Sequence, residues 1–496
     1  MKVISILSSV LAGILLSGNA PALELASVFT DHMVLQQKMD VPVWGKADPG
    51  ESVTVTFAEK QASAKAGPDG KWSVKLPPLT ASATPQILKA KGSNEEKSIS
   101  DVLVGEVWIA SGQSNMALPL SNSKGTAEEK AADPLIRLLH LPLNPQAKPV
   151  DEIGTTWQAD EAEKLGGFSA VAYYFARHLT ATRKVPVGII NSSVGGTPAR
   201  AWTSWESMAS DPRLKHQTDR IDADMKKYDP VVADQKYREA LAKYEADLAK
   251  QLAGKTQKKP TPPVPPSCYQ HSPSALYNGM IAPLAPMAIR GAIWYQGEAD
   301  TKVSAEYRIL LPAVINSWRK AFGHEIPFLF VQIAPHGMML PEIRDAQLHV
   351  WRTVPKTAMA VITDYGDATN IHPKDKKPVG DRLGLAARAI AYGENITYSG
   401  PLFDQIKIEG DKAILSFQHV GGGLVAKDGT LKGFEISGDG SIFVPATAEI
   451  QGAEVVVSNE TIKSPVTVRF GWANVPDTNL FNKEGLPASP FHAAIR

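Results

Sequence analysis

The sequence predicts an α/β fold, a parallel sheet with helices that is flanked along the chain by two β regions. Two patterns lead to this prediction. Between about residues 103 and 396, apolar strand-like segments alternate with helix-like segments, and the segments before and after contain short strands of alternating polarity. Strands that are apolar throughout and separated by helices are typical of a parallel sheet covered on both faces. At roughly 100–200 residues per domain, the 496 residues suffice for several domains.

Residues 1–22 have the pattern of a cleavable signal peptide. Lys2 supplies the positive charge, residues 3–16 are apolar except for Ser and Gly, and residues 20–22 are Ala-Pro-Ala, with small side chains at both cleavage-site positions. We therefore expect an exported protein, periplasmic or secreted; the alternative is a buried N-terminal helix. No later stretch is long and apolar enough to span a membrane, so we expect no membrane partner.

Residues 23–102 are expected to form an N-terminal β-sandwich region. Short segments rich in β-branched residues occur at 41–45, 53–57 and 72–76, and Pro-Asp-Gly at 68–70 is a turn signal. Short strands with turn signals between them are typical of a small sandwich.

The predicted sheet domain covers residues 103–396. Its expected strands are residues 102–110, 187–191, 291–295, 328–332 and 358–362, and its expected helices include residues 170–179, 305–322 and 379–392. An insertion at 206–270 is charged and helix-favouring up to about residue 250, and residues 258–266 form a stiff proline-rich connector. It is either a helical excursion that shapes a cleft or a solvated spacer.

Residues 397–496 are expected to form a C-terminal β region. Alternating segments recur at 405–409, 413–417, 454–458 and 466–470, and three glycines at 421–423 mark a loop. No internal repeat is visible.

Composition excludes several classes of function. Lys and Arg number 52 against 51 Asp and Glu, a net charge of +1, whereas a nucleic-acid partner normally requires a basic excess. The single cysteine, Cys268, excludes an internal disulfide and a Cys-rich zinc site. His178 and His271 lack metal-ligand spacing, so we expect no metal and no cofactor.

Four loops follow predicted buried strands, and the carboxyl ends of parallel strands share one edge of a sheet. These loops are residues 111–116, 191–197, 296–300 and 364–373. Together they contain the hydroxyl of Ser114, adjacent glycines, a carboxamide and the imidazole of His372. A hydroxyl, oxyanion donors and a base are the parts of a serine hydrolase. Met116 replaces the second glycine of the Gly-x-Ser-x-Gly elbow, so the α/β-hydrolase plan does not fit.

The strings at residues 105–116, 276–284, 294–300, 371–374 and 479–487 resemble those of the sialate O-acetylesterase family of SGNH-type hydrolases. The likeness runs from about residue 25 to the C-terminus. It implies a flavodoxin-like SGNH-hydrolase sheet with added β-sandwich regions. It also implies a substrate that is an acetylated carbohydrate, either a hemicellulose such as xylan or xyloglucan or a sialic acid.

The resemblance also implies roles for individual residues. Ser114 matches the nucleophile, His372 the base, and Gly195 or Gly196 a backbone donor to the oxyanion. Gln296 lies where a side-chain amide would supply a further donor, and the N–H of Ser114 would supply another. For Asn115, bracing the Ser114 loop and contacting substrate are both open.

The sequence departs from the SGNH pattern at the acidic member of the triad. An Asp usually stands three residues before the His, but that position is Thr369 here. Asp367 is our first choice for the acid if the loop curls, and Asp364 is better placed to fix the loop. Glu298 is the rival, unless it pairs with Arg344 instead. A Ser–His pair oriented by a backbone carbonyl is the remaining possibility.

The leading hypothesis is an exported carbohydrate O-acetylesterase acting through Ser114. The alternatives are a catalytically degenerate carbohydrate-binding protein and an exported serine peptidase. Arg200 is a nearby cation that a sialic acid carboxylate would favour, and aromatic side chains either line a sugar site or pack in the core. These aromatic residues are Trp202, Trp205, Tyr295 and Trp351. Nothing in the sequence predicts the oligomeric state.

Overall fold

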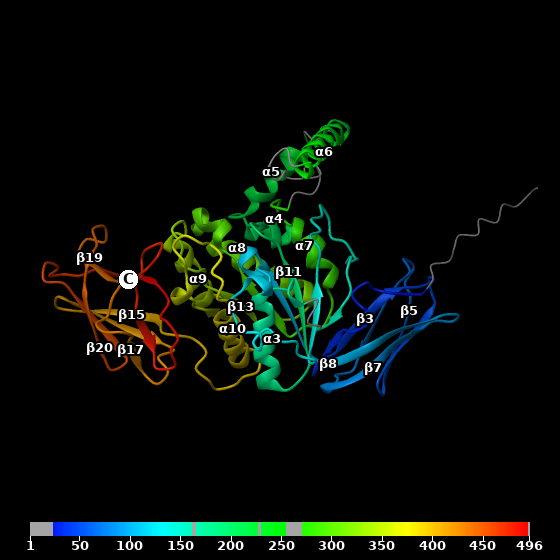
Figure 1. Cartoon of the computed structure of the whole chain (residues 1–496), viewed down its shortest axis with the longest axis horizontal. Helices are drawn as coiled ribbons and strands as arrows, with labels where there is room; N and C mark the ends of the chain where they lie inside the picture. Colours follow the sequence, from blue (N-terminus) through cyan, green and yellow to red (C-terminus); the bar gives the residue numbers. More distant parts are fainter. Residues whose placement is uncertain (1–22, 161–164, 227–229, 254–269, 495–496) are drawn as a thin grey trace, which may run out of the picture.

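The three predicted parts lie in a row in the computed structural model, with the N-terminal sheets at one end and the C-terminal sheets at the other (Figure 1). The structure describes residues 23–160, 165–226, 230–253 and 270–494. The predicted signal peptide, residues 1–22, and the proline-rich connector, residues 258–266, lie outside the described residues. No helix in the described ranges combines the length and apolarity that crossing a membrane requires.

The middle part contains a parallel sheet. Its strands, in spatial order, are β9 (Ile136–His140), β11 (Val187–Ser193), β8 (Glu96–Gly112), β12 (Gly291–Tyr295), β13 (Phe328–Val331) and β14 (Thr357–Ala360). The short β10 (Gln158–Ala159) pairs antiparallel with β9 at the edge. Every residue of β12, β13 and β14 is buried, which explains why their sequences are apolar on both faces.

Helices cover both faces of this sheet. On one face, α3 (Ala170–Arg183) packs against α10 (Lys377–Ile390), over alternate strand residues such as Ile293. On the other face, α8 (Ser304–Phe322) packs against α9 (Pro341–Thr353), over strand residues such as Trp294. Since successive strand residues point to opposite faces, the two neighbours Ile293 and Trp294 belong to two different apolar layers.

The N-terminal part consists of two antiparallel layers joined to the central sheet. One layer is β1 (Glu24–Leu25), β3 (Val41–Lys46) and β6 (Lys71–Leu76). The other is β5 (Lys60–Lys65), β4 (Ser52–Phe57), β7 (Ser82–Lys91) and the first half of β8, with β2 (Val34–Gln36) parallel to β8. Because β8 continues without a break into the central sheet, the expected boundary between residues 102 and 103 falls inside one strand.

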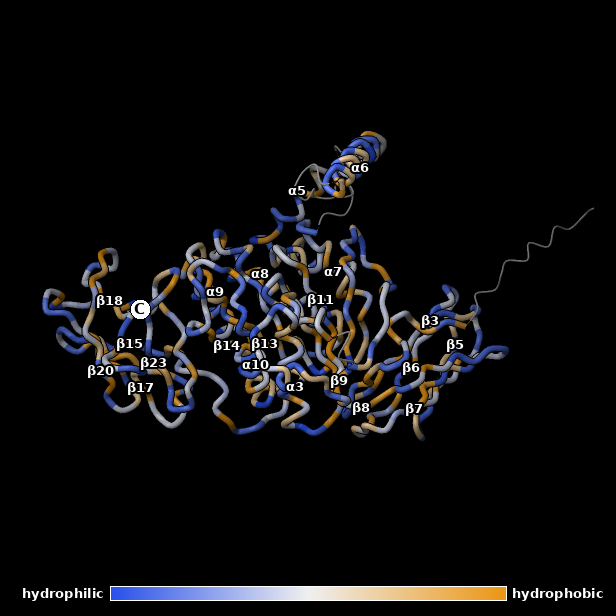
Figure 2. Tube along the Cα trace, viewed as in Figure 1, coloured by the Kyte–Doolittle hydropathy of each residue, from blue (hydrophilic) through white to orange (hydrophobic). Residues whose placement is uncertain are grey.

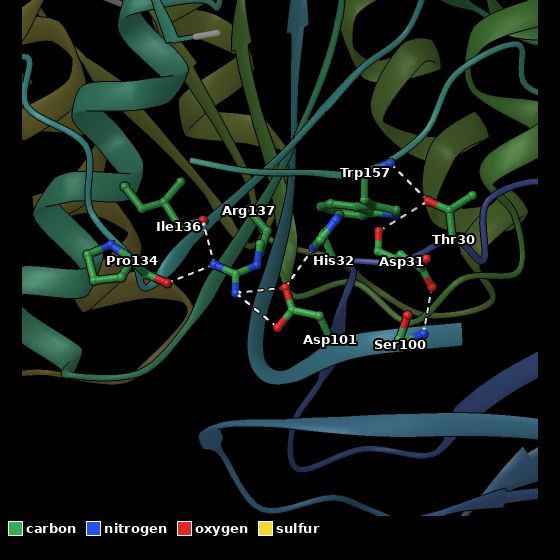
Figure 3. Close-up of polar contacts among 9 residues, drawn as sticks. All are labelled: Thr30, Asp31, His32, Ser100, Asp101, Pro134, Ile136, Arg137 and Trp157. Carbon is green, nitrogen blue, oxygen red and sulfur yellow. Dashed lines mark hydrogen bonds and ion pairs between the residues drawn. The ribbon is translucent and has the colours of Figure 1, made fainter. Parts of the chain in front are cut away.

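A cluster of polar side chains bonds β8, near Asp101, to neighbouring segments of the chain (Figure 3). The Asp101 carboxylate lies 2.6 Å from His32 Nδ1, and its two oxygens accept hydrogen bonds from Arg137 at 3.3 and 3.4 Å. Next to it, Asp31 accepts a 2.6 Å hydrogen bond from the Ser100 N–H. Arg137 stands at the edge of the central sheet, so the cluster joins the N-terminal layers to that sheet.

The C-terminal part contains three small antiparallel sheets. They are β15 (Leu402–Glu409), β16 (Lys412–Gln418), β21 (Glu454–Ser458) and β20 (Thr447–Gln451); β17 (Leu424–Ala426) with β23 (Leu480–Asn482); and β19 (Val444–Pro445), β18 (Phe434–Ser437), β22 (Thr467–Phe470) and β24 (Phe491–Ala494). Phe403 and Phe491 stack at 4.5 Å between ring centroids and join two of these sheets.

The insertion is helical where it is described. Its helices are α4 (Trp205–Ser210), α5 (Lys215–Lys226) and α6 (Pro230–Leu252), and α6 projects away from the body (Figure 1). Figure 2 shows many hydrophilic residues along α6, whereas hydrophobic residues gather around the central strands. The Gln217 amide of α5 donates to Glu306 at the start of α8 at 2.7 Å, which fastens the base of the projection.

Candidate active site

The loops after β8, β11, β12 and β14 meet at the carboxyl edge of the sheet. The Ser114 side chain lies 2.8 Å, Oγ to Nε2, from His372. A Cβ on Gly195 would lie 3.5 Å from Ser114 Cβ, so the β11 loop passes close to the serine. The Ala299 N–H of the β12 loop donates to the Gln113 side chain at 3.1 Å. The four loops selected from the sequence therefore form one site.

Ser114 begins a one-turn helix, α1 (Ser114–Ala117), directly after β8. Gly112, with φ +132°, makes this sharp turn possible, because a Cβ there would lie 2.2 Å from the Tyr295 carbonyl oxygen on β12. The first N–H groups of a helix have no acceptor within it. The N–H of Ser114, at the first position of α1, therefore has no acceptor within this helix.

His372 is half-buried in the loop after β14. Burial lowers the pKa of its imidazole, and the nearby charges of Lys376 and His336 lower it further. At neutral pH the imidazole is consequently uncharged, the form in which Nε2 accepts a proton. His336, which the sequence did not single out, follows β13 and binds the C-terminal part through its N–H and the Asn474 carbonyl at 3.3 Å.

The Asp367 carboxylate organises the loop that carries His372. Its Oδ1 accepts hydrogen bonds of 2.9 Å from the N–H groups of Thr369 and Asn370 and from the Thr369 hydroxyl. The Asn370 side chain in turn accepts from the His372 N–H at 3.0 Å. Asp367 is exposed and, among the described residues, has no hydrogen bond or ion pair with the imidazole. The bonds to its own loop lower the pKa of this carboxyl.

Asn115 connects the serine loop to two other loops. Its amide nitrogen donates to Glu298 Oε1 at 2.6 Å and to the Ile371 carbonyl, next to His372, at 2.9 Å. Glu298 is buried, and burial raises the pKa of its carboxyl. The alternative pairing of Glu298 with Arg344 is wrong: the Arg344 guanidinium donates to backbone carbonyls at 473 and 474 instead.

Lys376 completes this network and was missed from the sequence. Its Nζ donates to Asn115 Oδ1 at 2.6 Å, it is fully buried, and it lies 5.1 Å from the centre of the Tyr295 ring. Burial lowers the pKa of the Lys376 ammonium to about 7, against the opposing effect of Glu298. One lysine in an irregular loop carries no periodic signal, so nothing in the sequence marks it as buried.

The β11 loop and Gln296 contain the residues that the sequence predicts as oxyanion donors. Gly195 and Gly196 are exposed, and Gly196 has φ +73°. Gln296 is fully buried, and its amide nitrogen donates to the Thr197 carbonyl at 3.2 Å and to Asp300 at 2.6 Å. Both amide hydrogens thus have protein acceptors, and the side chain holds the glycine loop in place. Asp300, also missed from the sequence, accepts in addition from the Ala199 N–H at 2.9 Å.

The remaining predicted residues differ in how deeply they are buried. Trp202 and Tyr295 are fully buried and belong to the core, whereas Trp205 and Trp351 are partly exposed. Arg200 is partly exposed, and its Nε donates to the His271 carbonyl at 3.2 Å. In the described ranges, no group of three or more His, Cys, Asp or Glu side chains is arranged to hold a metal ion.

Comparisons with known proteins identify the family of the chain. The profile of the family described as carbohydrate esterase, sialic acid-specific acetylesterase, matches residues 104–254 and 267–387. The sialate O-acetylesterase of Mus musculus is 29% identical, covering 95% of this chain and 94% of that protein, and that of Homo sapiens is 30% identical, covering 95% and 92%. A crystal structure of a carbohydrate acetylesterase from Xanthomonas citri matches with a TM-score of 0.79 and 34% identity, covering 95% of this chain and all of that one.

Proposed function

The chain belongs to the carbohydrate esterase family of sialic acid-specific acetylesterases and is an esterase hydrolase. On that premise, we propose that it cleaves acetyl esters through an acyl-serine intermediate. The observation that carries this proposal is the 2.8 Å contact between Ser114 Oγ and His372 Nε2 at the carboxyl edge of the sheet. A hydroxyl bonded to a neutral imidazole is the arrangement that nucleophilic acyl transfer requires.

The proposed reaction has two halves. In the first, His372 takes the Ser114 proton while Oγ attacks the acetyl carbonyl carbon, and the resulting oxyanion is bound by the N–H groups of Ser114 and Gly195 or Gly196. As the intermediate collapses, the C–O bond to the sugar breaks and His372 returns the proton to the sugar oxygen. In the second, water attacks the acetyl-serine with the same base, which releases acetate and restores the serine.

The orientation of His372 is the least conventional part of the proposal. The Asp367 carboxylate bonds to its own loop, and Glu298 reaches the base loop only through Asn115 and the Ile371 carbonyl. We propose that Glu298 supports the base indirectly and that Asp367 acts by shaping the loop. A Ser–His pair without a directly bonded carboxylate is the mechanism that these contacts support.

We propose an acetylated carbohydrate as the substrate, either a hemicellulose oligosaccharide of xylan or xyloglucan type or an O-acetylated sialic acid. The curated mouse and human relatives are named for sialate esters, and the bacterial relative is a carbohydrate acetylesterase. Arg200, which follows the glycine loop in the chain, is one candidate cation for a sialic acid carboxylate, whereas a neutral sugar needs no such partner.

We also propose a domain division and a fold type. Without the edge strands β9 and β10, the parallel strands follow the order 2-1-3-4-5 in chain numbering, which is the flavodoxin-like order. The proposed SGNH domain covers residues 103–396, with flanking β regions at 23–102 and 397–496. The proposed export rests on the composition of residues 1–22, and the N-terminal sequence of the protein recovered outside the cytoplasm would test it.

The test of function is acetate release by the purified protein and by its Ser114→Ala variant. The substrates are acetylated xylan and xyloglucan oligosaccharides and O-acetyl sialic acid. We expect release from at least one class and its loss in the variant, by at least about 10⁴-fold in kcat. Activity that survives in Ser114→Ala would overturn the acyl-serine mechanism. No release by the unaltered protein would favour the degenerate binding protein, which the family match does not favour.

A further inference from the structure

Four side chains fill the space behind the Ser114–His372 pair, and none of them faces solvent. They are Asn115, Tyr295, Glu298 and Lys376, each at most 6% exposed. They come from four different elements: α1, β12, the short turn of helix after β12, and the loop between His372 and α10. Burying an ammonium is costly unless it is bonded, so a lysine kept at such a place needs an explanation.

Lys376 has one hydrogen-bond partner in this space. Its Nζ donates to Asn115 Oδ1 at 2.6 Å, and the amide nitrogen of Asn115 reaches both Glu298 and the Ile371 carbonyl. The Asn115 amide is thereby fixed in one orientation, because its oxygen faces a donor and its nitrogen faces two acceptors. Asn115 is the residue after Ser114, and Ile371 is the residue before His372.

We propose that Lys376 is a positioning residue of this esterase, whose ammonium, acting through Asn115, fixes the distance between the Ser114 and His372 loops. This inference rests on the proposed acyl-serine function. In this proposal, a lysine and an asparagine orient the histidine base, whereas SGNH hydrolases usually use a carboxylate three residues before the histidine for this purpose. Glu298, whose carboxyl bonds to Asn115, partly balances the lysine charge.

The same lysine affects the base electrostatically. The groups around Lys376 are Asn115, Tyr295, Glu298 and His372, and the charge of His336 also acts on His372. The Lys376 charge lowers the pKa of His372, since a cation disfavours a second one. Below about pH 7 the lysine is charged, so in the acid range it keeps the imidazole in its neutral, proton-accepting form.

The experiment measures kcat and KM for acetate release between pH 4.5 and 9 in four proteins: the unaltered chain, Lys376→Met, Lys376→Arg and Lys377→Met. Lys377→Met is the matched control, because Lys377 is the next residue and forms a partly exposed ion pair with Asp381 at 2.7 Å. For Lys376→Met we expect kcat to fall about 10–100-fold with little change in KM. We also expect the acid limb of the profile to move upward by about 0.5–1 pH unit. Lys376→Arg should keep the limb in place, and Lys377→Met should match the unaltered chain.

A double-variant cycle tests the path through Asn115. If Lys376 acts through Asn115, Asn115→Ala should lower kcat by itself, and adding Lys376→Met should lower it little further. An active enzyme with an unshifted acid limb in Lys376→Met would overturn the proposal. If Lys376→Met does not fold, full kcat in Asn115→Ala would overturn it equally. Activity in Ser114→Ala would instead refute the acyl-serine function, so the two failures are distinguishable.

Discussion

The buried amide of Gln296 holds the glycine loop beside Ser114. Its nitrogen bridges the Thr197 carbonyl and Asp300, and Asp300 also holds the Ala199 N–H. We predict that Gln296→Ala loosens the glycine loop and lowers kcat by about 10²-fold, since small misplacements of donors have effects of that size. It should also lower the free energy of unfolding by about 1–3 kcal/mol, because a buried acceptor loses its donor.

Gln332 is the matched control for this prediction. It is also fully buried at the end of a parallel strand, and its amide donates to the Arg344 carbonyl at 3.0 Å and to Ser489 at 2.8 Å. Gln332→Ala should destabilise the fold to a similar extent, measured by urea unfolding, while kcat changes less than about fivefold. Equal losses of kcat in both variants would mean that Gln296 acts only through stability.

If His372 is the base, as proposed, its protonation sets the pH dependence of the unaltered enzyme. The imidazole must be neutral to accept the serine proton, so activity rises with pH through its pKa. Burial first, then Lys376 and His336, lower that pKa below the 6.5 of an ordinary histidine. We predict an acid limb of kcat/KM with its midpoint below pH 6.5, measured with a soluble acetyl ester. A midpoint above 6.5 would require an anionic partner for His372 that these contacts do not contain.

At the scale of elements, the cap of α3 supports α1, the short helix that carries Ser114. Ser169 is the N-cap of this helix: its Oγ accepts from the Ala172 N–H at 3.1 Å and donates to the Met116 carbonyl of α1 at 2.6 Å. We predict that Ser169→Ala lowers the free energy of unfolding by about 1–2 kcal/mol and kcat by several-fold. The control is Ser204→Ala, which removes the 3.2 Å cap bond of α4. It should lower stability similarly but leave kcat unchanged, and a comparable loss of kcat there would contradict the link to α1.

The elements that sequence reasoning predicts are those with a simple apolar pattern. Strands such as β13 are apolar throughout because both faces are covered by helices. Helix α9 was not predicted, because Arg344 and Gln347 are polar and yet buried within it and interrupt the helical pattern. Strand β7 was also missed, since most of its residues are exposed or half-exposed and they show no regular alternation of buried and exposed positions in its first half.

The site, like the fold, could be predicted only in part from the sequence. Ser114 and His372 each follow a recognisable strand, and strand ends at one edge of a sheet must meet. Their geometry was therefore accessible from the sequence. Lys376 and Asp300 were not, because their burial depends on side chains from other loops that close over them. The sequence predicts Gln296 as an oxyanion donor, whereas its amide nitrogen donates to the Thr197 carbonyl and to Asp300, partners that depend on how the glycine loop folds back.

At the scale of the whole molecule, the three parts share strands and a core. Strand β8 belongs to both the N-terminal layers and the central sheet. One buried apolar cluster runs from Leu23 through Trp294 to Ala493. The C-terminal part also reaches the site region, because Asn474 accepts from the His336 N–H. Such sharing is unlike the separate cores of independent domains.

We therefore predict that the protein unfolds in one transition, although chains of this length often unfold in several. Asp101→Ala tests this at the junction in Figure 3, since it removes the contacts to His32 and Arg137 at a residue with φ +50°. It should lower the urea concentration at the midpoint of the whole transition, and lower the free energy of unfolding by about 1–3 kcal/mol. Lys89→Ala, which removes an exposed ion pair with Glu96 in the same layers, should change it by less than about 1 kcal/mol. Circular dichroism and residual activity, followed together in urea, should give coincident curves. An early step in Asp101→Ala that leaves activity intact would show that the N-terminal layers unfold alone.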